Sequence, residues 1–126
     1  MKSIFEYRDY HLYLQDYYDE RKRLGAFSWR EFCRKAGFSS PNFLKLVSMG
    51  QSKLSKIKAS QVAKSMGLVD YEEEYFYQLV AFGNAENNEA QRAAYLEMQR
   101  ISLEHQVRVV DKDAFQYYES WKYPES

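Results

Sequence analysis

The amino-acid sequence predicts an all-α protein, a single bundle of five or six helices. Apolar residues recur at three- and four-residue steps through most of the 126 residues, which is the spacing of one face of an α-helix. Glycines and capping residues stand where these helical patterns begin and end. A chain of this length can form one domain with a hydrophobic core. We assign residues 1–110 to that domain and residues 111–126 to a linker or the start of a truncated C-terminal element.

The first predicted helix covers residues 9–24. Asp9 stands near its start and Gly25 supplies a natural stop, while basic residues near its end complement the helix dipole. One apolar stripe runs along it, formed by Tyr10, Tyr13, Leu14, Tyr17 and Leu24. We expect this stripe to face the core.

Three short helices follow over residues 28–36, 40–49 and 55–66, joined by turns marked with glycine. Ser28 and Glu31 have the spacing of a capping box, and Phe27 and Phe32 occupy the two positions of a hydrophobic staple. Gly37 can adopt the left-handed conformation that a tight turn requires. This arrangement over residues 27–69 is typical of a helix-turn-helix, which delivers one short helix into a DNA groove.

The second of these helices is the predicted recognition helix. Pro41 suits its first turn, with Ser39 or Ser40 as its cap. Its expected inward residues are Phe43, Leu46 and Val47, with Leu44 between the faces and Ser40, Asn42, Lys45 and Ser48 facing outward. In the following helix, the expected inward residues are Ile57, Ala59, Val62, Ala63 and Met66.

The C-terminal half begins with an acidic helix. Asp70 and Glu73 have the spacing of a second capping box, and Gly83 and Asn84 mark the end of that helix. A longer helix covers residues 89–108, beginning at Glu89 and ending at Arg108, and a further fragment covers residues 113–123. The long helix has two apolar stripes, one with Ala90, Ala94, Met98 and Ile101 and one with Ala93, Leu96, Leu103 and Val107. Because packing on one core uses one stripe, the second predicts a homodimer or contact with a missing domain.

The net charge of zero conceals a strong asymmetry along the chain. Residues 27–69 carry eight basic residues and one acidic residue, a net charge of +7, whereas residues 70–126 carry five basic and twelve acidic residues, a net charge of −7. A basic segment that coincides with a helix-turn-helix favours a polyanionic partner. The alternative is that the two segments neutralise each other within the fold.

The sequence favours a non-enzymatic protein without a cofactor or metal. His11 and His105 lack metal-ligand spacing, and Cys33 in the middle of a helix is better explained by packing than by catalysis. No segment predicts a membrane span or a secretory signal, and one cysteine cannot form an internal disulfide. We therefore expect a soluble cytoplasmic protein.

Two segments resemble the helix-turn-helix of Cro and phage repressors: Ala36-Gly37-Phe38-Ser39, and the run from Val62 to Leu68. The wider chain, with Ser3-Ile4-Phe5-Glu6-Tyr7 and Tyr117-Tyr118-Glu119-Ser120-Trp121, is similar to an uncharacterised bacterial family described as transcriptional regulators. Members of that family continue into a second domain of unknown function. The resemblance implies that this chain is the DNA-binding module of such a regulator.

The resemblance also implies which residues contact double-stranded DNA. The first outward positions of the recognition helix would contact base edges, and the loop after it would contact phosphates. Asn42 can pair with adenine and Lys45 can reach the acceptors of guanine. The candidates are Arg30, Ser40, Pro41, Asn42, Lys45, Ser48, Gln51, Ser52 and Lys53. Trp29 replaces a glutamine common in the family, and Pro41 and Leu44 are apolar, so a degenerate helix-turn-helix that binds protein is the alternative.

Overall fold

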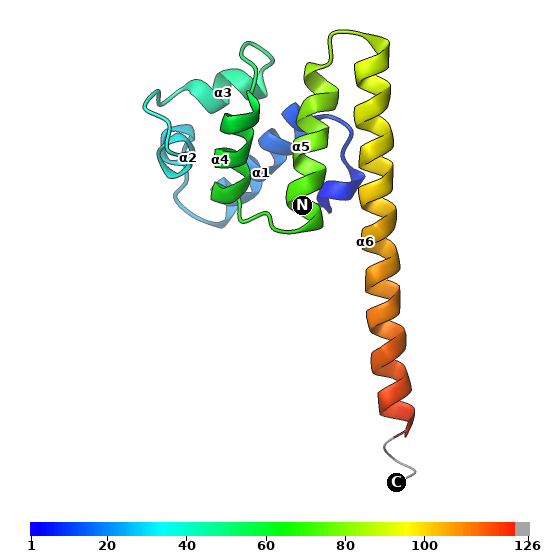
Figure 1. Ribbon diagram of the computed structural model, residues 1–126. Helices are drawn as coiled ribbons and strands as arrows, with labels where there is room; N and C mark the ends of the chain where they lie inside the picture. Colours follow the sequence, from blue (N-terminus) through cyan, green and yellow to red (C-terminus); the bar gives the residue numbers. More distant parts are fainter. Residues whose placement is uncertain (123–126) are drawn as a thin grey trace.

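The computed structural model describes the backbone of residues 1–122 and the side chains of residues 1–110. Six α-helices and one 3-10 helix form this part of the chain, which confirms the all-α prediction (Figure 1). They are η1 (Ile4–Glu6), α1 (Tyr10–Leu24), α2 (Trp29–Ala36), α3 (Phe43–Ser48), α4 (Lys56–Ser65), α5 (Tyr71–Asn84) and α6 (Asn88–Lys122). None of the helices in the described residues combines the length and apolar composition of a membrane span.

Helices α2, α3 and α4 form the predicted helix-turn-helix region. The Ser28 hydroxyl accepts a hydrogen bond from the Glu31 backbone N–H at 3.1 Å, and the Phe27 and Phe32 ring centroids lie 5.7 Å apart. These contacts confirm the serine cap and the staple, although the Glu31 carboxylate bonds Arg34 instead of completing the box. Gly37 ends α2 with a φ of +87°, as a left-handed turn requires.

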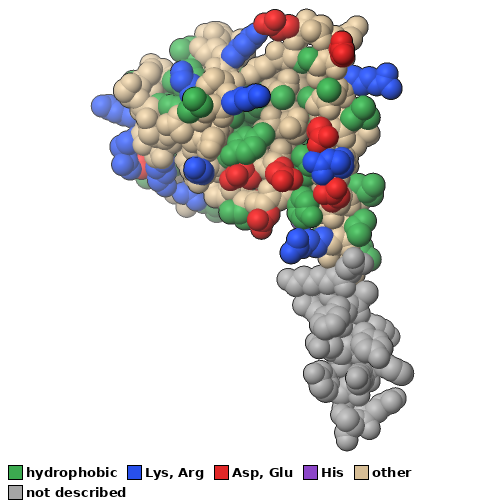
Figure 2. Space-filling model, in the orientation of Figure 1, with side chains coloured by type: hydrophobic (Ala, Val, Ile, Leu, Met, Phe, Trp, Pro, Cys, Tyr) green, Lys and Arg blue, Asp and Glu red, His purple; other side chains and the backbone are tan. Residues whose placement is uncertain are grey.

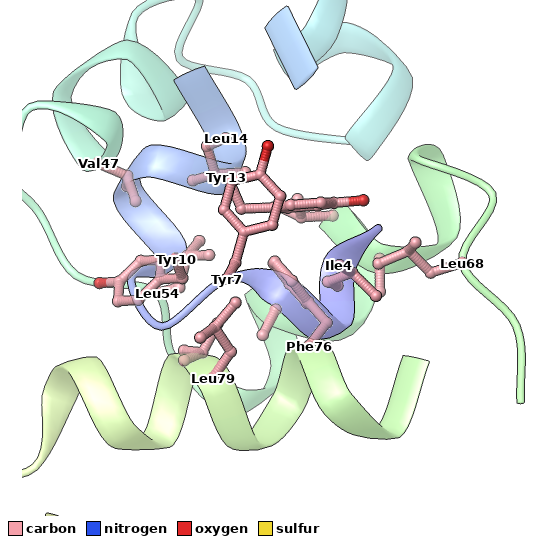
Figure 3. Packing of buried hydrophobic residues seen from close by; sticks show 14 of the residues in the cluster. Ile4, Tyr7, Tyr10, Tyr13, Leu14, Val47, Leu54, Leu68, Phe76 and Leu79 are labelled. Carbon is pink, nitrogen blue, oxygen red and sulfur yellow. The ribbon is translucent and has the colours of Figure 1, made fainter. Parts of the chain in front are cut away.

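A cluster of tyrosines joins η1 and α1 to α5. Tyr7 lies among Tyr13, Phe76 and Leu79 in the core (Figure 3). Its hydroxyl donates to Asp16 at 2.6 Å, and its backbone carbonyl accepts a hydrogen bond of 2.6 Å from Tyr75. The hydroxyls of Tyr7 and Tyr75 are therefore hydrogen-bonded, while their rings supply buried apolar area.

Asn84 connects three parts of the core at the end of α5. Its side chain accepts a hydrogen bond from the Tyr10 hydroxyl at 2.9 Å and donates one to the Leu54 carbonyl at 2.8 Å. The neighbouring Gly83 lies so close to the Tyr10 ring that an added Cβ would stand 2.6 Å from two ring carbons. The helix end predicted at these residues is thus also a packing contact between α5 and α1.

Helix α6 packs against α5, on the side of the molecule away from α2 and α3 (Figure 1). It is one continuous helix to Lys122, whereas the sequence predicted an end at 108 and a separate fragment at 113–123. No proline or glycine occurs between residues 108 and 122, so nothing local ends the helix. Ala94, Met98 and Ile101 are buried as predicted, but Ala90 is exposed.

Three further expectations about individual residues are wrong. Leu24 and Ile57, expected in the core, are 67% and 78% exposed. Leu24 is the last residue of α1, and Ile57 lies on the face of α4 opposite the buried Ala59 and Val62. Asp70 makes no side-chain cap for α5, since its φ of +54° and ψ of −126° depart from the extended conformation typical of such caps. The acidic residues Glu72, Glu73 and Glu74 do lie in the first turn of α5.

Candidate nucleic-acid interface

Helix α3 is shorter than predicted and begins at Phe43. Ser40, Pro41 and Asn42 lie in the turn before it, where the Ser40 carbonyl accepts a hydrogen bond from the Phe43 N–H at 3.4 Å. The expected helix start at residue 40 is wrong. Ser40 precedes a proline, which disfavours the α conformation there, and Pro41 and Asn42 form a turn before the helix. Asn42 is the N-cap but forms no side-chain capping bond, so neither Ser39 nor Ser40 caps the helix.

Ser48 was expected to face outward and contact phosphate, but it is 3% exposed. Its hydroxyl donates to the Lys45 carbonyl at 2.7 Å, and its own carbonyl accepts a hydrogen bond from the Gln15 side chain at 2.7 Å. These contacts join α3 to α1. Ser48 therefore helps to anchor the helix on α1, and its expected outward orientation is wrong.

The buried face of α3 is rotated from the predicted one. Leu44, Val47 and Ser48 are buried, whereas Leu46 is 37% exposed. Buried Cys33 explains part of this orientation, because its sulfur accepts a hydrogen bond from the Leu44 N–H at 3.4 Å. Cys33 thus packs in the core as predicted and also binds one of the unpaired amides at the start of α3. The spacing of Leu44, Val47 and Ser48 fits one helical face, but the polarity of serine argued against it.

The other candidate residues remain accessible. Arg30, Ser40, Pro41, Asn42, Lys45, Gln51 and Lys53 are exposed, and Ser52 is half-buried. The loop is held to the end of α3 by two hydrogen bonds, from the Gly50 N–H to the Val47 carbonyl at 3.0 Å and from the Gln51 N–H to the Leu46 carbonyl at 2.9 Å. The start of this loop is therefore held in place beside the end of α3.

The ion pairs of the described side chains do not link the basic segment to the acidic half of the chain. Among the side chains that the structure describes, no ion pair joins residues 27–69 to residues 70–110. The one acidic residue of the basic segment, Glu31, pairs with Arg34, and this hydrogen bond lowers the pKa of the Glu31 carboxyl. Ion pairs between residues 27–69 and residues 70–110 therefore do not contribute to the packing of these two segments.

The two signs of charge are distributed unevenly over the molecule. Lysine and arginine side chains gather on the side where α2 lies, whereas carboxylates lie at both ends of α5 and on α6, where some arginines stand among them (Figure 2). Helix α3 packs against α1 and α2. Lys45 and Lys53 are exposed and have no carboxylate within 4.0 Å among the described residues.

Comparison with family models, curated proteins and solved structures finds no match. The resemblance to repressors and to bacterial regulators therefore stays a prediction from the sequence.

Apolar residues are also exposed on this segment, which the sequence did not predict. Leu46, Met49 and Ile57 are 37%, 54% and 78% exposed.

Lys58 lies over the Phe43 ring with its Nζ 4.4 Å from the centroid, so part of the basic charge is placed against an aromatic face. Among the described residues, no three potential ligands of the His, Cys, Asp or Glu types form a metal site.

Proposed function

We propose that this chain is the DNA-binding module of a bacterial transcriptional regulator. The observation that carries the proposal is the basic helix-turn-helix segment, with its net charge of +7 and no ion pair to the acidic half among the described side chains. A double helix of DNA carries one negative charge per about 1.7 Å of its axis, and exposed lysines bind it with release of counterions.

In this proposal, the N-terminal end of α3 contacts bases and the loop after α3 contacts phosphates. Asn42 is exposed at the N-terminus of α3 and can form a bidentate pair with adenine in the major groove. Lys45 follows on the first turn and can reach guanine or a phosphate. Gln51 and Lys53 in the loop, with Arg30 on α2, would contact the phosphate backbone and orient the module.

The burial of Ser48 reduces the number of candidate DNA contacts on α3. Its side chain is 3% exposed and is not available to a phosphate. Ser40 and Pro41 precede the helix. In this proposal they would contact the DNA backbone or one base edge. Direct readout by one module would thus rest on few side chains, and useful specificity would require a second copy on a neighbouring half-site.

The test is a salt series of DNA affinity, using duplexes selected from fragmented genomic DNA. The double variant Lys45→Ala, Lys53→Ala should bind more weakly, and the slope of log K against log salt should fall by about 1.8, or about 0.9 for each lost phosphate contact. The matched control Lys2→Ala, Arg92→Ala removes the same charge from exposed residues outside the basic segment. Equal slopes for the two double variants would contradict the proposed contacts.

The second candidate function is a protein-interaction module, which the exposed Leu46, Met49 and Ile57 favour. Exposed apolar side chains near a polar rim mark many protein interfaces. Selection that enriches no DNA sequence above a chain lacking residues 40–53 would favour this candidate. A triple variant with serine at these three positions should then lose the protein partner, while DNA affinity, if present, should change little.

A further inference from the structure

Helix α6 has a second apolar stripe that nothing in the described structure covers. Leu96, Leu103, Val107 and Val110 are 52%, 61%, 52% and 64% exposed. At about 100° per residue, they lie within an arc of about 60° on the helix surface. That arc is opposite Met98 and Ile101, which are buried in the core.

The stripe has the spacing of a coiled-coil seam. Leu96 is followed by Leu103, Val107 and Val110 at steps of seven, four and three residues. In a heptad written abcdefg, the two leucines and Val110 occupy d positions, and Val107 occupies an a position. Ala93 occupies the preceding a position. The sequence continues the same spacing with Ala114, Tyr117 and Trp121, so the pattern covers about four heptads.

The residues beside the stripe distinguish between the two possible orientations of a partner helix. Glu97 and Glu104 occupy the e positions, and Gln99 and Gln106 occupy the g positions. In a parallel pair each g position faces an e position, so glutamine meets glutamate and can donate a hydrogen bond. In an antiparallel pair e faces e, and glutamates of like charge would meet. The charge pattern therefore favours a parallel pair.

Arg100 lies within the stripe at an a position. Its guanidinium contacts the Glu97 carboxylate at 2.7 Å and the Glu104 carboxylate at 3.0 Å. These two carboxylates offset the repulsion that two facing arginines would experience. A single polar residue at an a position also disfavours shifted alignments, because a shift would place it against an apolar layer.

We propose that this stripe binds a second copy of the chain, forming a parallel, in-register coiled coil through α6. The proposal names the surface and the orientation of the dimer, and it does not require that the protein bind DNA. One consequence does rest on the proposed function. A parallel dimer holds two helix-turn-helix units at the same end of the coiled coil, where they can occupy two half-sites about 34–36 Å apart.

The first test is the mass of the chain in solution. The wild type should be a dimer at about 100 μM by light scattering, and the variant Leu103→Glu, Val110→Glu should dissociate at least about a hundredfold more readily. The control Leu24→Glu, Val69→Glu changes two exposed apolar residues outside α6, one on α1 and one between α4 and α5, and should stay dimeric. A monomeric wild type, or a dimer that the stripe variant leaves intact, would overturn the proposal.

The second test determines orientation. In a parallel, in-register pair the two copies of residue 103 face each other, so Leu103→Cys should form a disulfide-linked dimer under mild oxidation. Gln91→Cys is the control, because it is exposed on another face of α6. The native Cys33 is buried and provides the background in the unmodified chain. Faster crosslinking at residue 91 than at residue 103 would refute the in-register arrangement. A chain that binds DNA as a monomer would contradict this proposal but not the proposed function. A dimer that binds no DNA would contradict the proposed function but not this proposal.

Discussion

Gly83 provides a sharp test of how α5 is held against α1. Replacing a glycine inside an exposed helix with alanine usually stabilises the protein, because glycine costs about 1 kcal/mol of helix propensity. At this position the structure predicts the opposite result. The added Cβ would lie 2.6 Å from Cδ1 and Cε1 of the Tyr10 ring, which is much closer than ordinary van der Waals contact.

The size of the effect depends on whether the ring can move. Tyr10 is 0% exposed, and its hydroxyl donates to Asn84, which in turn bonds the Leu54 carbonyl. Overpacking of a core commonly costs about 1–3 kcal/mol, and a displaced hydrogen bond costs about 1 kcal/mol more. After the helix-propensity gain is subtracted, we expect Gly83→Ala to lower the free energy of unfolding by about 1–3 kcal/mol.

Denaturant unfolding, followed by circular dichroism, measures this change. Gly25→Ala is the matched control, because its φ is 179° and an added Cβ meets no atom within 4 Å. That control should be neutral or slightly stabilising. Combining Gly83→Ala with Tyr10→Leu should cost less than the sum of the two single changes, because both act on the same contact. A Gly83→Ala variant as stable as the wild type would refute the close packing of α5 on α1.

Two further predictions concern the core and the start of the helix-turn-helix. Burial, with smaller effects of Glu72 and Tyr17, raises the pKa of Tyr13 to about 12. Since the unfolded phenol titrates near pH 10, the stability that Tyr13 contributes is complete below that pH and is lost as the pH rises to about 12, at about 1.4 kcal/mol per pH unit. Tyr13→Phe should flatten this part of the curve of unfolding free energy against pH. Separately, Ser28→Ala should cost about 1 kcal/mol in denaturant unfolding, and the same change at exposed Ser39 should cost much less.

Much of the local structure could be predicted from the sequence because the signals are themselves local. The Ser28 cap acts within three residues, and the φ of Gly37 is set by the turn in which it lies. The basic and acidic segments are likewise properties of the sequence alone. These features predicted the helical class, the helix-turn-helix region and most of the basic residues of the candidate interface.

The orientation of α3 was decided only by the tertiary structure. A helix of six residues has fewer than two turns, so its apolar pattern fits more than one inward face. The contacts of Cys33 with Leu44 and of Gln15 with Ser48 select one of them, and these partners are 11 and 33 residues apart in the chain. The same limit applies to Gly83. A side chain is excluded at this position by the ring of Tyr10, which lies 73 positions earlier in the chain. Sequence periodicity describes one helix at a time, whereas the exposed face of the candidate interface is set by the neighbours that bury the other face.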